Sequence, residues 1–468
     1  MTQHRVHAFT DDALGSHDAV GLVAALHAGE VSVSEVVEAA IARAERVEPQ
    51  LNAIAHRGYD QARAEAQAPR PGFFAGVPTW VKDNSLLEGM PTRHGTDAWD
   101  PAPDPADGDF ARMYRAAGAV VLGKSRLPEY GFLPTCEHPR LGPVHCPWDT
   151  TRTAGASSAG SAALVAAGVV PIAHANDGGG SIRIPAAVNG LVGLKPTRGR
   201  IPTDKLAREQ PVQIVADGVV TRSVRDTAAF MREAERIYRP LKLPPIGDLT
   251  RPTKARLRIA VQTNALDREA SPEVVELTMK TAALLESLGH HVEEASLPVP
   301  ASFQDDFLLY WATLAMFLTR TGKRVHGPSW LLANHDEFTF GLAAHALRRL
   351  PKVPLAIARL RSVRRSAERF FSSYDVHLAP TLASETPVIG HLDPMQDFEV
   401  TLDRLLDWMS ITPYQNVTGQ PAISLPLATT AAGLPHGMMF SAGAGREGRL
   451  IELAYELEEA SPFASIQA

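Results

Sequence analysis

Gly155-Ala-Ser-Ser-Ala-Gly-Ser161 and Asn176-Asp-Gly-Gly-Gly-Ser-Ile-Arg-Ile-Pro185 are the two most informative segments of this 468-residue sequence. In the second segment, three consecutive glycines directly precede Ser181. Glycines leave bare backbone amides beside the serine hydroxyl, and such N–H groups can stabilise the negative charge that develops when a serine attacks a carbonyl. A plain glycine-rich turn would have the same residues. The segment therefore predicts either a serine nucleophile with an oxyanion hole or a turn.

The composition is that of an ordinary globular protein, with 45% hydrophobic and 21% charged residues. A formal net charge of −6 gives no electrostatic reason to bind nucleic acid. The two cysteines, Cys136 and Cys146, indicate neither a disulfide framework nor a zinc site. The sequence contains neither an apolar secretory segment at its start nor a run of roughly 20 apolar residues. We therefore expect a cytoplasmic protein without a membrane span or a nucleic-acid partner, and the sequence leaves open whether it is a monomer or homodimer.

Hydrophobic patterns predict alternating helices and strands. The first 70 residues are expected to be helical, with a stripe from Val36 to Val47 that Pro49 ends. Gly76 to Val81 should form a turn and a short buried strand, after which Lys82 stands. A strand at 258–261, a helix at 271–288 and a strand at 291–293 favour an α/β sheet with parallel pairs. Other strands are expected at 119–122, 378–380 and 422–426, and a last helix at 450–459.

Two nucleotide-binding patterns match only as strings of letters. The segment 118–125 fits the phosphate-loop pattern, but its middle residues favour a strand, and Pro128 hinders the helix that should follow. The segment 443–448 fits GxGxxG, but the residues after it leave no room for the second strand of a dinucleotide fold. HExxH and GxSxG are both absent from the sequence. We therefore expect no nucleotide cofactor, no metal and no Ser-His-Asp triad.

Longer motifs resemble those of the amidase signature family. They are GVPTWVKDN at 76–84, GASSAGSAA at 155–163, DGGGSIRIPAA at 177–187 and GLVGLKPT at 190–197. The resemblance extends from about residue 15 to 460 and is strongest at 76–202. It implies an α/β fold whose central, mostly parallel, mixed and twisted β-sheet is covered by helices on both faces.

The sequence contains no linker that would divide it, so we expect a single amidase-signature domain over residues 1–468. Within it we expect an N-terminal helical region at 1–70 and a catalytic core at 71–300. A helical insertion at 302–371 would border the substrate cleft, and 372–468 would supply the C-terminal strands and helix.

The resemblance assigns the catalytic residues by position. The family's lysine falls on Lys82, its bridging serine on Ser157 and its nucleophile on Ser181. The family has a cis peptide before the bridging serine, where this sequence has Ala156 in place of the usual glycine. The implied oxyanion amides belong to Gly178, Gly179, Gly180 and Ser181. Asp177 and Arg183 match signature positions that we interpret as structural.

This set of residues implies amide hydrolysis through an acyl-enzyme, without a cofactor. Neutral Lys82 would take a proton through Ser157 and so free the Ser181 oxygen for attack. A lysine has an ordinary pKa of about 10.4, so the mechanism requires a large downward shift, which burial can provide. Lys82 follows an apolar strand, which is compatible with burial.

The substrate is less constrained by the sequence. The resemblance is closest to the bacterial branch around 6-aminohexanoate cyclic dimer hydrolase, aryl acylamidases and urethane-cleaving amidases. It implies that the loop 131–137 lines the cleft and that 302–340 covers it, with substrate-binding residues Gly131, Phe132, Leu133, Pro134 and Thr135. The covering segment carries Phe303, Phe307, Tyr310, Trp311 and Phe317, for which core packing is the alternative. We hypothesise a medium-sized, uncharged aliphatic or aryl amide as the substrate.

Three alternatives stay open at this point. The same triad could hydrolyse a carbamate or an ester. A glutamine-dependent amidotransferase A-type subunit is disfavoured, because those subunits typically have Gln where Ile184 stands. A binding protein that retains the fold is the third. Separately, the basic run 348–369 could form a membrane-surface helix or a solvated helix face.

Overall fold

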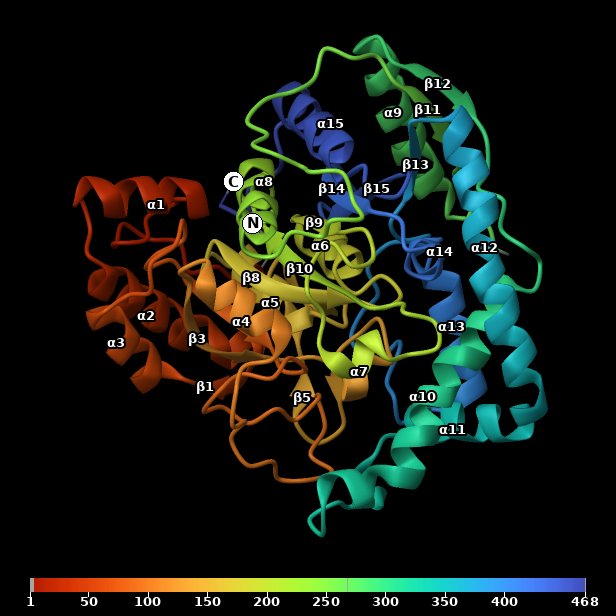
Figure 1. Cartoon of the computed structure of the whole chain (residues 1–468), viewed down its shortest axis with the longest axis horizontal. Coiled ribbons are helices and arrows are strands. Elements are labelled where there is room, and N and C mark those ends of the chain that lie inside the picture. Colours follow the sequence, from red (N-terminus) through yellow and green to blue (C-terminus); the bar gives the residue numbers. More distant parts are fainter. Residues whose placement is uncertain (1–3, 267, 468) are drawn as a thin grey trace.

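An eight-stranded mixed sheet forms the centre of the protein (Figure 1). The computed structural model describes residues 4–266 and 268–467. The strand order is β12-β11-β13-β15-β14-β9-β10-β8. The strands are β8 (Ile172–Asp177), β9 (Val192–Lys195), β10 (Ala216–Thr221), β11 (Arg258–Val261), β12 (His291–Glu294), β13 (Val376–Pro380), β14 (Ala422–Thr429) and β15 (Pro435–Ala442). Strands β9, β10, β13 and β15 are buried along their whole length, as expected of a sheet that is covered on both faces.

Parallel pairing occurs at one end of this sheet, where β11 pairs with β12 and with β13. The other five pairs between neighbouring strands of this sheet are antiparallel. The predicted mixed α/β sheet is therefore confirmed, but its mostly parallel character is wrong. The connections give the reason: α9 (Pro272–Ser287) crosses from β11 to β12, whereas a short turn joins β14 directly to β15. A crossover helix makes strands parallel and a hairpin makes them antiparallel.

A second, three-stranded sheet carries Lys82. Its order is β1-β3-β2, with β1 (Ile54–Arg57), β2 (Pro78–Lys82) and β3 (Val120–Ser125). All five residues of β2 are buried, as its apolar sequence predicts. Strand β3 occupies the phosphate-loop-like string, and its Lys124 is buried with Nζ donating to Ser85 O and Thr92 Oγ1. This segment is therefore a core strand, as the sequence predicts.

The N-terminal region contains α1 (Ala19–Ala28), α2 (Val33–Leu51) and α3 (Tyr59–Gln67), with β1 between the last two. The predicted capping box at the start of α2 is present, because Ser32 and Glu35 bond each other's backbone N–H groups. The prediction that Pro49 ends α2 is wrong, since the helix continues to Leu51 and ends at the left-handed Asn52. Proline removes one donor and restrains the residue before it, and the last turn of a helix tolerates both.

Helices cover the sheet on both faces (Figure 1). One group comprises α4 (Asp109–Ala116), α5 (Ala159–Ala166), α6 (Arg183–Asn189), α7 (Lys205–Arg208), α8 (Val224–Ile237) and α15 (Glu447–Ala460). A second group, on the right of Figure 1, comprises α10 (Phe303–His326), α11 (Glu337–Arg348), α12 (Val353–Ser373), α13 (Phe398–Trp408) and α14 (Thr412–Thr418). Short elements are β4 (Glu137–His138), β5 (Gly142–Pro143), β6 (His145–Cys146), β7 (Asp149–Thr153) and the 3-10 turns η1 (Glu129–Gly131), η2 (Leu332–Asn334) and η3 (Leu350–Lys352).

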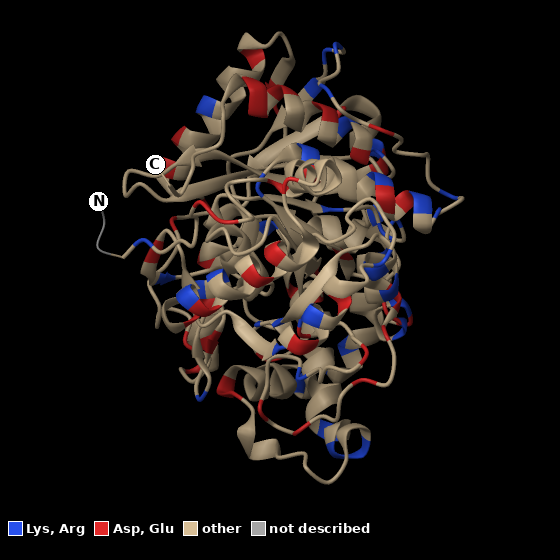
Figure 2. Cartoon of the chain, turned by 90° about the vertical axis from the view of Figure 1, so that its left-hand side faces the viewer, with Lys and Arg blue, Asp and Glu red and all other residues tan. Residues whose placement is uncertain are grey.

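The basic run 348–369 spans the end of α11 and most of α12. Several of its arginines are engaged within the chain: Arg361 donates to Pro211 O, Arg364 pairs with Glu368, and Arg359 lies 3.6 Å from Asp306. Figure 2 shows Lys and Arg residues interspersed with Asp and Glu residues along the chain. In the described part of the chain, no helix is long and apolar enough to cross a membrane.

Candidate active site

Lys82 ends β2 and is completely buried. Its Nζ lies 2.8 Å from Ser157 Oγ and 2.7 Å from Asn176 Oδ1. Burial lowers its pKa from 10.5 to about 7, although the negative charges of Asp177 and Asp217 act in the opposite direction. Near neutral pH a large fraction of this lysine is therefore uncharged, with a nitrogen lone pair available to accept a proton.

Ser157 lies just before α5, and the Ala156–Ser157 peptide bond is cis, as the resemblance implies. The loop at Gly131 packs directly against this serine. Gly131 has a φ of +73°, and a Cβ atom there would lie 2.9 Å from Ser157 Oγ. Glycine at this position therefore allows the cavity loop to approach the Ser157 hydroxyl.

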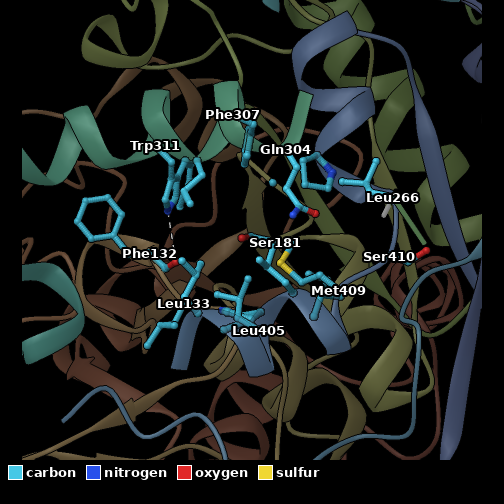
Figure 3. A pocket seen from close by; sticks show the side chains of 18 of the residues that line it. Phe132, Leu133, Ser181, Leu266, Gln304, Phe307, Trp311, Leu405, Met409 and Ser410 are labelled. Carbon is cyan, nitrogen blue, oxygen red and sulfur yellow. Dashed lines mark hydrogen bonds between the residues drawn. The ribbon is translucent and has the colours of Figure 1, made fainter. Parts of the chain in front are cut away.

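Ser181 follows β8 and precedes α6, at the wall of a large cavity (Figure 3). Its backbone carbonyl accepts a 2.6 Å hydrogen bond from Ser158 Oγ, which fixes the turn from inside the protein. The Gly180 N–H donates to Asp177 Oδ1 at 2.7 Å. Because an N–H group has one hydrogen, this bond removes Gly180 from the oxyanion donors that the resemblance implies. The amides of Gly178, Gly179 and Ser181 remain as candidates.

Asp177 and Arg183 form a buried ion pair beneath this loop. Arg183 Nε donates to Asp177 Oδ2 at 2.9 Å and its Nη2 to Oδ1 at 3.0 Å, and both residues are fully buried. Asn416 bonds both partners, with Nδ2 donating to Asp177 Oδ1 and Oδ1 accepting from Arg183 Nη2. Burial alone would raise the pKa of Asp177, but the Arg183 charge and these hydrogen bonds hold it below its ordinary value. The pair thus stays charged and fixes the loop, which agrees with a structural role.

Asn176 is a site residue that the sequence analysis missed. Its Oδ1 accepts from Lys82 Nζ, while its Nδ2 donates to Asn84 Oδ1 at 2.9 Å. Strand geometry offers a way to find it, because alternate side chains of β8 point to the same face. His174, two residues earlier, also contacts Lys82: its Nδ1 accepts from the Lys82 backbone N–H at 3.2 Å.

The cavity at Ser181 has a volume of about 880 Å³, open mouth included, and is mostly apolar. Of the predicted substrate-binding residues, Gly131, Phe132, Leu133 and Pro134 line it, whereas Thr135 is fully buried and does not. Helices α11 and α13 add residues that the sequence analysis did not name: Phe338, Leu342, Leu402, Leu405 and Leu406.

Helix α10 covers the glycine loop with three aromatic side chains. Phe303, Phe307 and Trp311 lie one turn apart and line the cavity, with ring centroids 6.2 Å and 5.8 Å apart. Cβ atoms added at Gly178 and Gly179 would contact Trp311 at 3.4 Å and Phe307 at 3.5 Å. These rings therefore shield the glycine backbone from water.

Two aromatic residues of α10 do not line the cavity, and for Tyr310 the alternative of core packing holds. The Tyr310 hydroxyl donates to Val212 O at 2.8 Å and is buried in the core. Phe317 is 59% exposed. Both stand off the stripe formed by Phe303, Phe307 and Trp311, because successive helical residues are rotated by about 100°.

Comparisons with known proteins find similar sequences over most of the chain. The family model described as Amidase matches residues 35–451. A protein of Mycobacterium tuberculosis that is provisionally named amidase AmiC is 59% identical, over 99% of this chain and 98% of that protein. The 6-aminohexanoate-cyclic-dimer hydrolase of Paenarthrobacter ureafaciens is 33% identical, over 95% of each chain.

Two solved structures extend these similarities to three dimensions. The structure of 6-aminohexanoate cyclic dimer hydrolase complexed with substrate has a TM-score of 0.86 at 30% identity, covering 97% of this chain and 98% of the other. A bacterial aryl acylamidase of the amidase signature family has a TM-score of 0.83 at 27% identity, covering 96% of each chain.

Proposed function

This chain belongs to the amidase family and is an amide-hydrolysing enzyme, and we propose that Ser181, Ser157 and Lys82 carry out its reaction. One observation carries the proposal: a buried lysine with a pKa near 7 lies 2.8 Å from Ser157 Oγ, in the same site as a serine at the cavity wall. A serine hydroxyl is a poor nucleophile until a base removes its proton. Lys82 has the burial that such a base requires.

In the proposed reaction, Lys82 Nζ accepts the Ser157 Oγ proton while Ser157 Oγ accepts the proton of Ser181. Ser181 Oγ then forms a bond to the carbonyl carbon, and the resulting oxyanion accepts hydrogen bonds from the remaining glycine-loop amides. The C–N bond breaks as the same relay returns the proton to the amine nitrogen. Water, deprotonated by the relay, attacks the acyl ester, releases the acid and restores Ser181.

The substrate class that we propose is a medium-sized, uncharged aliphatic or aryl amide. The cavity is lined by apolar side chains next to Ser181, among them Phe132, Leu133 and Ile184. Apolar burial of an acyl chain or aromatic ring is favourable at about 25 cal/mol per Å². Two of the similar proteins are named for amides of this kind, one for a cyclic dimer of 6-aminohexanoate and one for aryl acylamides.

The test uses a panel of anilides, aliphatic amides, carbamates and esters of equal acyl chain length on the purified protein. We expect hydrolysis of the uncharged anilides, and covalent labelling by a fluorophosphonate probe. Ser181→Ala should abolish both, whereas Ser362→Ala, on the exposed face of α12, should change neither. Turnover of carbamates or esters with no turnover of any amide would contradict the proposed substrate class, and labelling of the Ser181→Ala protein would contradict the proposed nucleophile.

A further inference from the structure

The cavity has two unlike sides around Ser181. Figure 3 shows Phe132 and Leu133 on one side, and Leu266 and Ser410 on the other. On the first side the rings of Phe132 and Trp311 meet edge to face, with centroids 5.7 Å apart. This side offers a substrate only apolar contacts.

Gln304 is the exception on the apolar face of α10. It shares a stripe with Leu308 and Trp311, four and seven residues later, and all three line the cavity. Figure 3 shows its side chain projecting from α10 toward Ser181, away from Phe132. A helix that only shielded the cavity would have an apolar residue here, as it has at the next two positions of the stripe.

The Gln304 carboxamide has unused hydrogen-bonding capacity. The side chain is half-buried, and neither its oxygen nor its nitrogen is bonded to another residue in the described part of the chain. A carboxamide can donate two hydrogen bonds and accept two. A ligand that covered it without satisfying it would lose the hydrogen bonds that water now provides.

The charge of the cavity disfavours an anionic partner for this group. Among the described residues that line the cavity, Arg268 is the only charged one. Its guanidinium pairs with Asp403 at 2.6 Å and also with Asp407, so its charge is already balanced. A substrate carboxylate would therefore lose hydration without gaining a free cation.

We propose that Gln304 is a specificity-determining residue. It binds a carbonyl or carboxamide group of the substrate that is uncharged and is separate from the scissile amide. This inference rests on the proposed function and narrows its substrate class. The preferred substrate is an amide with one apolar arm, seated against Phe132 and Trp311, and one arm that carries a neutral hydrogen-bonding group. A second carboxamide matches Gln304 best, since it donates and accepts at once.

The experiment uses matched pairs of amides that differ only in a terminal group, carboxamide or isopropyl, which have nearly the same shape. One series varies the acyl arm and the other the amine arm, each with one to four methylenes. At the best length, wild-type kcat/KM should be about tenfold higher for the carboxamide, the value of one good hydrogen bond. Gln304→Leu should reduce this ratio to about one. The Gln304→Leu activity toward the isopropyl compound should rise above that of wild type, because this compound then no longer covers a carboxamide whose hydrogen bonds to water are lost.

Asp305→Asn provides the matched control, because Asp305 is exposed on the same helical turn. Its ratio should equal that of the wild type. An unchanged ratio in Gln304→Leu, or no carboxamide preference at any length in either series, would overturn the inference while leaving amide hydrolysis intact. Failure of the wild type to hydrolyse any member of either series would instead contradict the proposed function, and the inference with it.

Discussion

Lys82 and Asn176 are joined by a 2.7 Å hydrogen bond between Nζ and Oδ1. Asn176 Nδ2 is in turn held by Asn84 Oδ1, which directs the amide oxygen rather than the NH₂ group toward the lysine. A neutral amine has two hydrogens and one lone pair. With Asn176 accepting one hydrogen, the lone pair can turn toward Ser157 Oγ, 2.8 Å away. Asn176 thus orients the amine of Lys82. Because the amide of Asn176 is neutral, it does not add a negative charge that would favour the protonated form of the lysine.

Asn176→Asp tests this arrangement, because it changes the shape little and adds a negative charge. An opposite charge at this distance favours protonated Lys82 and raises its pKa by roughly 1–3 units. We expect kcat/KM at pH 7 to fall by about tenfold or more and to recover at higher pH. The pH dependence of kcat/KM measures this shift. Asn334→Asp, between α10 and α11, is the control; an equal displacement of its profile would show that the effect is not local to Lys82.

The wild-type protein should have an acid limb in its pH–rate profile that belongs to Lys82. Burial places the pKa of this lysine at about 7, far below 10.5. Below pH 7 the ammonium form predominates and cannot accept the Ser157 proton, so kcat/KM should fall about tenfold per pH unit. Above pH 7 activity should level off as Lys82 becomes neutral. A profile that stays flat down to pH 5 would contradict the assignment of Lys82 as the base.

Ser157 and Ser158 are adjacent serines with different expected effects. The Ser157 hydroxyl lies against Lys82 Nζ, whereas Ser158 Oγ donates to Ser181 O at 2.6 Å. Loss of the relay in Ser157→Ala should reduce kcat by roughly 10²–10⁴-fold with little change in KM. Ser158→Ala removes one hydrogen bond, worth about 1 kcal/mol, and should cost about tenfold or less. Steady-state kinetics measure kcat and KM of both variants. Equal losses of kcat would contradict a proton relay through Ser157.

We expect activity to require the absence of a side chain at Gly131, in addition to the positive φ that glycine allows there. A methyl group in Gly131→Ala would lie 2.9 Å from Ser157 Oγ and displace that hydroxyl. Gly433 supplies a matched control, since its φ of +77° is close to the +73° of Gly131 but a Cβ there would contact nothing within 4 Å. Both substitutions should lower stability by roughly 1 kcal/mol through backbone strain. Only Gly131→Ala should also lose most of kcat, and thermal unfolding with kinetics separates the two effects.

Most elements of this fold are predictable from local sequence patterns, because an apolar run or stripe specifies a strand or helix wherever it packs. The run before Lys82 and the strand–helix–strand pattern at 258–293 are examples, and β2, β11, α9 and β12 confirm them. The helix between β11 and β12 also predicts their parallel pairing, but the directions of the other pairs were not predictable in this way. They depend on which strands become neighbours, and β9 and β14, far apart in sequence, pair antiparallel because of the tertiary arrangement.

The candidate site likewise has features that the sequence predicts and features that depend on tertiary structure. The resemblance to the family's motifs assigns Lys82, Ser157 and Ser181, and the structure brings Lys82 and Ser157 into contact across 75 residues of chain. The hydrogen bond from the Gly180 N–H to Asp177 could not be predicted from the local sequence, because the sequence does not specify which acceptor a backbone N–H group binds. Nor does it separate Tyr310 from Phe307 on α10, although the helical repeat would do so once one cavity-facing residue was known. Residues of α13 reach the cavity only through tertiary packing, which the local pattern does not encode.

Asp177→Asn should destabilise the protein as well as inactivate it. The substitution leaves the fully buried Arg183 without its carboxylate partner, and breaking such a pair typically costs 3–5 kcal/mol. The amide that replaces the carboxylate has only one oxygen, so it cannot accept from both the Gly180 and the Ile182 N–H groups, and the loop around Ser181 loses one of these two hydrogen bonds. Chemical denaturation of the variant measures the first effect and kcat the second. Glu276→Gln, which breaks the exposed pair with Lys280 on α9, serves as the control and should change neither quantity measurably. If Asp177→Asn retained wild-type stability, the ion pair would not hold the loop, and the fixed position of Ser181 would need another cause.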